Sequence, residues 1–120
     1  MNKELFAEYF VQRFPEYTNE LKFHLEEYGE LLGHVFFGVI INSQIVQLLR
    51  TDSNPARTKL MLDFVNELYL EGDDECKNIV VVTILEYLGD DKEVLKKALD
   101  YLDLELQEES RRVERFLGRD

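Results

Sequence analysis

The sequence predicts an all-α fold, and three observations support this prediction. Apolar residues recur at intervals of three and four along almost all of the 120 residues, which is the period of an amphipathic helix. Proline and glycine stand where these periodic segments end. Hydrophobic residues make up 45% of the chain, which is enough for one core. We therefore expect a single domain, residues 1–120, of about six helices.

The first half of the chain divides into three expected helices. The first covers about 3–14, with Asn2 as its N-cap. Pro15 stops that helix and suits the first turn of a second one, which Gly29 ends. The third covers about 30–50 and holds the longest apolar stretch of the chain. We expect it to be the central helix of the core.

Gly33 and Gly38 lie inside this expected central helix. Each glycine costs about 1 kcal/mol relative to alanine, so we expect close approach of another helix to offset the cost. The apolar stretch 31–49 also contains polar residues, which favour a core helix over a membrane span. These residues are His34, Asn42, Ser43, Gln44 and Gln47.

A fourth helix is expected from Pro55, with Asn54 as its cap, to about Glu71. Its expected inward residues are Leu60, Met61, Phe64, Val65 and Leu68. Gly-Asp-Asp at 72–74 ends it and caps a fifth segment, 75–88. Within that segment, 79–85 is apolar on all sides and rich in β-branched residues, so a buried strand is the alternative. We favour a helix, because aspartates cap the segment and no partner strand is evident.

A second Gly-Asp-Asp turn at 89–91 ends the fifth segment and caps a long last helix. The apolar stripe of this helix is Val94, Leu95, Ala98, Leu99, Leu102 and Leu106, with Val113, Phe116 and Leu117 as its continuation. The two similar turns indicate a weak internal repeat of helix pairs. A short HEAT-like stack and an irregular antiparallel bundle both fit this pattern.

Residue patterns for catalysis or metal binding are scarce. His24 and His34 are the only histidines, and no spacing typical of a zinc or diiron site surrounds them. Cys76 has acidic neighbours and no nearby histidine, so we interpret it as an inert thiol. We expect no cofactor, no metal and no enzymatic activity. The alternative is an enzyme with an unrecognised site near His34 and Asn42 on the central helix.

A lone cysteine allows no internal disulfide, and the first residues do not resemble a signal peptide. These features are typical of a cytoplasmic protein. The net charge of −11 disfavours direct binding of nucleic acid, because phosphate binding needs an excess of lysine and arginine. The acidity is concentrated: residues 63–109 contain fifteen acidic and four basic side chains.

Acidic residues on the outer side of the later helices can attract and steer a basic protein. The candidate partner-binding residues are Asp63, Glu67, Glu86, Asp100 and Asp103. The alternative is that these carboxylates only keep the protein soluble.

The chain resembles the small acidic helical immunity proteins of bacterial toxin systems. The resemblance rests on size, acidity, the lack of catalytic motifs, and a HEAT-like helix pair around Leu88-Gly89-Asp90-Asp91-Lys92-Glu93 within residues 55–106. It implies a non-enzymatic protein that neutralises a basic toxin, often a nuclease. An adaptor or regulatory subunit that uses the same face for another partner is the alternative.

Overall fold

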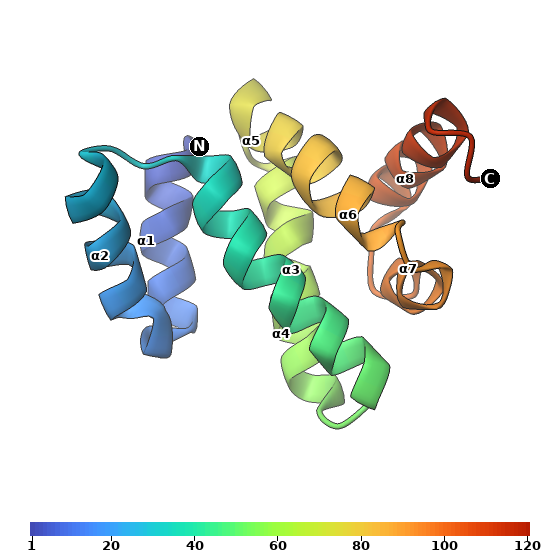
Figure 1. Ribbon diagram of the computed structural model, residues 1–120, viewed down its shortest axis with the longest axis horizontal. Helices are drawn as coiled ribbons and strands as arrows, with labels where there is room; N and C mark the ends of the chain where they lie inside the picture. The colour runs from blue at the N-terminus through green and yellow to red at the C-terminus, as the bar shows by residue number, and fades with distance from the viewer.

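Helices account for all the regular structure in the computed structural model, which describes residues 1–120 (Figure 1). The all-α prediction is confirmed: there is no strand, and there are seven helices when the continuous run from α5 through η2 to α6 is counted as one and the short turn η1 is left out. The elements are α1 Lys3–Arg13, η1 Pro15–Tyr17, α2 Thr18–Tyr28, α3 Gly33–Thr51, α4 Pro55–Leu70, α5 Asp74–Asn78, η2 Ile79–Leu85, α6 Glu86–Leu88, α7 Lys92–Leu99 and α8 Leu104–Phe116. The HEAT-like stacking of the helix pairs stays a prediction.

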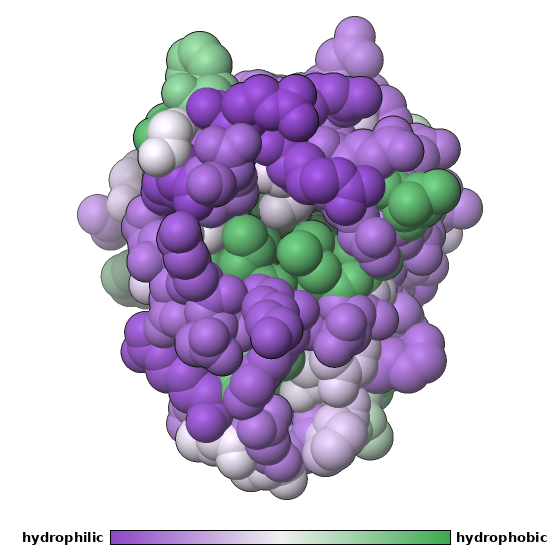
Figure 2. Space-filling view, turned by 90° about the vertical axis from the view of Figure 1, so that its right-hand side faces the viewer, coloured by the Kyte–Doolittle hydropathy of each residue, from purple (hydrophilic) through white to green (hydrophobic).

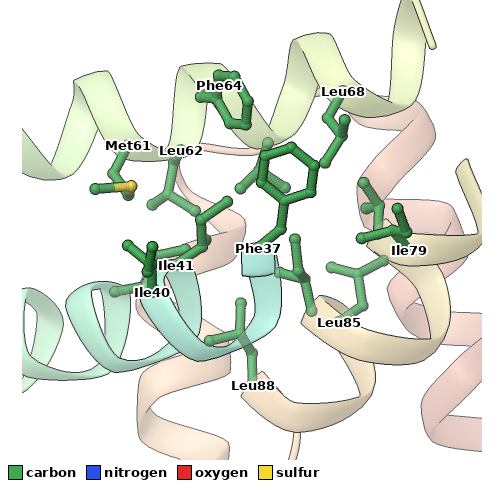
Figure 3. Packing of buried hydrophobic residues seen from close by; sticks show 14 of the residues in the cluster. Phe37, Ile40, Ile41, Met61, Leu62, Phe64, Leu68, Ile79, Leu85 and Leu88 are labelled. Carbon is green, nitrogen blue, oxygen red and sulfur yellow. The ribbon is translucent and has the colours of Figure 1, made fainter. Parts of the chain in front are cut away.

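Helix α3 runs diagonally through the middle of the molecule, as expected (Figure 1). The α1–α2 pair lies at one end, and α7 and α8 lie at the other. Buried residues from Phe6 to Leu106 form one apolar cluster. Figure 3 shows Phe37 of α3 pointing between Phe64 and Leu68 of α4, and all three side chains are buried. No helix combines the length and apolar character needed to cross a membrane.

Several helices begin at the side-chain caps that were predicted from the sequence. The side chains of Asn2, Asn54, Asp73 and Asp91 accept hydrogen bonds from backbone N–H groups in the first turns of α1, α4, α5 and α7. Gly29 ends α2 in the left-handed conformation, with φ of 72°. These caps satisfy backbone donors and acceptors that a helix end leaves free.

The central helix begins at Gly33, so the expected start at residue 30 is wrong. Leu31 precedes the helix in an extended segment, where its side chain is buried in the core. The backbone N–H of Leu32 donates to Nε2 of His24 at 3.0 Å. This hydrogen bond gives the non-helical segment a partner from α2 that a pattern of apolar residues cannot reveal.

Segment 79–85 is helical, and the strand alternative is wrong. It forms the π-helix η2 in the middle of one continuous helix from α5 to α6, and the N–H of Glu86 donates to the carbonyl of Val81. A Cβ atom on Gly33 would lie 2.6 Å from Cδ1 of Ile79, and one on Gly38 would lie 2.6 Å from Cγ2 of Thr83. The expected close approach at both glycines is therefore confirmed, and the approaching element is η2.

The last helix is not continuous, contrary to expectation. It breaks between α7 and α8 over residues 100–103. Asn66 of α4 lies beside this break, where its Nδ2 donates to the carbonyl of Tyr101 at 3.1 Å and its Oδ1 accepts from the N–H of Asp103 at 2.9 Å. The buried Asn66 amide thus replaces helical hydrogen bonds. The apolar residues keep their helical spacing across the break, so this spacing did not predict the break.

Candidate functional site

An acidic hollow of about 570 Å³ lies along the outer side of α4. Three of the five predicted partner-binding residues line it: Asp63, Glu67 and Asp103. We define the acidic hollow by all eight of its lining residues. They are Arg13, Leu60, Asp63, Asn66, Glu67, Leu70, Glu71 and Asp103.

The carboxylates of the acidic hollow come from two parts of the chain. Asp63, Glu67 and Glu71 recur every four residues, which places them on one face of α4 and its C-cap. Asp103 is the N-cap residue of α8, and its backbone N–H donates to Asn66. The break between α7 and α8 therefore brings the fourth carboxylate to the surface of α4.

Two cations partly neutralise the acidic hollow. Arg13 of α1 donates to both carboxylate oxygens of Glu67, and this hydrogen bonding raises the pKa of Arg13. Lys59 donates to Asp63 at 2.8 Å, one turn away on α4. Glu71 and Asp103 have no ion-pair partner in the structure. The lining of the hollow carries four carboxylates against one guanidinium, so it attracts positive charge.

Two leucines give the acidic hollow an apolar component. Leu60 is 52% exposed and Leu70 is 39% exposed. The prediction that Leu60 faces inward is wrong, because its neighbour Met61 is the residue that enters the core. Exposed leucines among carboxylates suit a partner surface that combines basic and apolar side chains.

The remaining predicted site residues lie elsewhere. Glu86 lines a polar groove between α3 and α6, and Asp100 is exposed at the end of α7 without lining the acidic hollow. The structure therefore brings Asp63, Glu67 and Asp103 together in one hollow and places Glu86 on a different groove. The π-helix before Glu86 changes the helical register, and this change was not visible in the sequence.

The polar groove has a volume of about 740 Å³ and contains His34 and Asn42, the residues of the enzyme alternative. Nδ1 of His34 lies 2.5 Å from Oγ1 of Thr83. Nδ2 of Asn42 donates to the Thr83 carbonyl at 3.1 Å, while its buried Oδ1 has no partner. Ser43 donates to helix carbonyls at Val39 and Ile40, so its hydroxyl is already engaged.

A third hollow, of about 520 Å³, lies between α2 and α3 and is mainly apolar. Phe23 lines it and is 67% exposed, although it belongs to the periodic apolar residues of its helix. His24 is the only buried residue of α2. Burial lowers the pKa of His24, which matches its role as an acceptor for the Leu32 N–H.

Cys76 is buried in the core. Burial, followed by its hydrogen bond to Asp73, raises its pKa to about 12. The thiolate, which is the reactive form, is therefore strongly disfavoured at neutral pH. No group of three or more histidine, cysteine, aspartate or glutamate side chains is placed to hold a metal ion.

Sequence reasoning missed Glu71, Leu60 and Leu70 as members of the acidic hollow. Glu71 could have been predicted as a member of the hollow, because it lies one turn beyond Glu67 on the same helical face. The exposure of Leu60 depends on which of two adjacent apolar residues enters the core. That choice is made by tertiary packing, so no local pattern indicated it.

Comparisons with the curated proteins and with the solved structures found no match. One family model matches residues 7–118, which is nearly the whole chain and includes every residue of the acidic hollow. The chain therefore belongs to the family described as "Domain of unknown function (DUF7674)".

Proposed function

We propose that this chain is a non-enzymatic protein-binding module whose acidic hollow receives a basic segment of a partner protein. The observation that carries the proposal is the gathering of Asp63, Glu67, Glu71 and Asp103 around two exposed leucines. Carboxylates steer a basic partner to the surface, and desolvated leucines add affinity after contact. Asp100 is exposed at the end of α7 and lies outside the hollow.

The partner that best fits this surface is a basic bacterial toxin, with the chain acting as its immunity protein. The resemblance to small acidic helical immunity proteins supports this assignment, as does the rigid helical support beneath the hollow. An inhibitor of this kind needs a preformed surface rather than catalytic groups. A regulatory subunit or adaptor with a basic partner would use the same surface, so the identity of the partner decides between them.

The proposal is tested by affinity capture from the cells that naturally produce the protein, followed by mass spectrometry. Three baits are compared: the wild type, Glu67→Lys with Asp103→Lys, and Glu8→Lys with Glu26→Lys. The last bait has the same net charge as the second, but its substitutions lie on exposed positions of α1 and α2. We expect a basic protein to be captured by the wild type and the control, and to be lost from the second bait.

Recovery of a toxin domain supports immunity, and recovery of a metabolic or signalling protein supports the adaptor. A partner retained equally by all three baits contradicts the assignment of the acidic hollow. The neutral pair Glu67→Gln with Asp103→Asn serves as a milder variant if charge reversal disturbs folding.

An enzyme at the polar groove is the second candidate, and the contact between His34 and Thr83 favours it. A hydroxyl beside an imidazole is an arrangement that can generate a nucleophile. His34→Ala separates the two candidates. If His34→Ala still captures the partner but the protein loses its activity in the cells that naturally produce it, the enzyme is supported. If His34→Ala keeps that activity in full, this imidazole has no role in catalysis.

A further inference from the structure

A second groove, of about 380 Å³, separates α7 from α8 and has the opposite charge. Lys92 and Lys96 line it from α7, and Arg111 and Arg115 line it from α8. Arg119, Glu114 and Asp120 also line it, and Arg119 is paired with Glu114. Leu95 and Leu99 form its apolar floor. Figure 2 faces this side of the molecule and shows an apolar patch surrounded by hydrophilic side chains. We call this site the basic groove.

Unpaired cations are unexpected on a protein with a net charge of −11. Lys92, Lys96 and Arg111 make no ion pair in the structure, although acidic side chains greatly outnumber basic ones in the chain. Arg115 approaches only Asp120, at 3.9 Å. Lys92, Lys96 and Arg111 are therefore available to carboxylates from outside the chain.

The spacing of the groove residues indicates the shape of the ligand. Lys92 and Lys96 are one helical turn apart, and so are Arg111 and Arg115, so each wall carries a short row of positive charge. The apolar floor lies between the two rows. An amphipathic helix with one apolar face and acidic flanks has the same arrangement with opposite charge.

We propose that the basic groove binds an acidic amphipathic helical segment of a partner protein. Its apolar side chains contact Leu95 and Leu99, and its carboxylates pair with the cations of both walls. Nucleic acid fits less well, because the acidic remainder of the chain repels a long phosphate backbone and the floor is apolar. The proposal is independent of the function proposed for the acidic hollow.

The test uses a synthetic helical peptide with a leucine stripe flanked by glutamates, labelled for fluorescence anisotropy. The net charge of the protein repels this peptide everywhere except at a local positive site. The protein variants are Lys96→Glu with Arg111→Glu, and Lys22→Glu with Arg112→Glu as the charge-matched control. The control cations lie on exposed positions outside the basic groove.

We expect saturable binding that weakens about tenfold or more in Lys96→Glu with Arg111→Glu. We expect a smaller loss in the control than in the groove variant. Replacing the glutamates of the peptide by glutamines should abolish the difference between the wild type and the groove variant.

Four results would overturn the proposal. The first is the absence of binding, and the second is an equal loss in the control variant. The third is tighter binding of a single-stranded oligonucleotide than of the peptide. The fourth is self-association of the wild type that the groove variant abolishes, because the occupant would then be a second copy of the chain.

Discussion

Arg13 on α1 donates hydrogen bonds to both carboxylate oxygens of Glu67 on α4. This pair joins two helices that are 54 positions apart in the sequence and lies at the edge of the acidic hollow. Both side chains are more than one third exposed, so the pair contributes little to stability. Its main consequence is electrostatic, since Arg13 neutralises a carboxylate that would otherwise attract a basic partner.

Replacing Arg13 by glutamine should therefore make the acidic hollow a better electrostatic target. We expect association with a synthetic peptide of lysines and leucines to become about two- to threefold faster at low salt, with the gain lost as screening increases. The free energy of unfolding should fall by about 0.5 kcal/mol. Stopped-flow fluorescence measures the rate. Arg112→Gln, whose cation pairs with Glu109 on α8, is the control and should leave the rate nearly unchanged.

A methyl group at Gly38 should destabilise the protein, although alanine is the better helix former. The added Cβ would lie 2.6 Å from Cγ2 of Thr83, so either the Thr83 side chain or the packing of α3 against η2 would have to shift. We expect Gly38→Ala to lower the free energy of unfolding by about 1–3 kcal/mol in urea titrations. Combining it with Thr83→Ala should restore part of the loss. Strictly additive effects of the two substitutions would contradict direct contact.

Removing the Asn66 amide should disrupt the junction between α7 and α8. Asn66→Leu leaves the Tyr101 carbonyl and the Asp103 N–H without their buried partners. We expect a loss of about 2–4 kcal/mol in the free energy of unfolding. Asn19→Leu, on the exposed side of α2, should change it by less than about 0.5 kcal/mol. Similar effects of the two substitutions would show that the amide does not hold the junction.

His24 should make stability depend on pH in the mildly acidic range. Burial lowers its pKa below the ordinary 6.5, and its Nε2 must be unprotonated to accept from Leu32. The unfolded chain binds the proton more readily, so the stabilisation is present above about pH 6.5 and is lost as the pH falls toward the folded pKa. We expect the free energy of unfolding to fall progressively as the pH drops below about 6.5. In His24→Phe, the free energy of unfolding measured by urea titration should not change over this pH range.

Most of the fold could be predicted from local sequence signals. Asn2, Asn54, Asp73 and Asp91 marked helix starts because a cap requires only a short polar side chain before the first turn. Gly38 indicated a close helix contact because glycine in a helix is costly without a compensating gain. Such signals are contained within a few residues and do not depend on distant parts of the chain.

The features that could not be predicted depend on residues distant in sequence. Asn66 stabilises the break at 100–103 from another helix, and His24 binds the segment before α3 in the same way. The acidic hollow was predicted in part, since Asp63 and Glu67 share a helical face. Asp103 reaches it only because the last helix breaks. Glu86 lines the polar groove, and the π-helix that precedes it had no signal in the sequence.

The central claim is that the acidic hollow binds a basic partner, and the dissociation constant of the captured partner tests it most directly. It is measured by calorimetry at two salt concentrations for the wild type, for Glu67→Lys with Asp103→Lys, and for the control Glu8→Lys with Glu26→Lys. We predict that reversal in the hollow weakens binding at least about tenfold and reduces its dependence on salt, while the control binds nearly as tightly as the wild type. Equal dissociation constants for all three proteins would contradict the account.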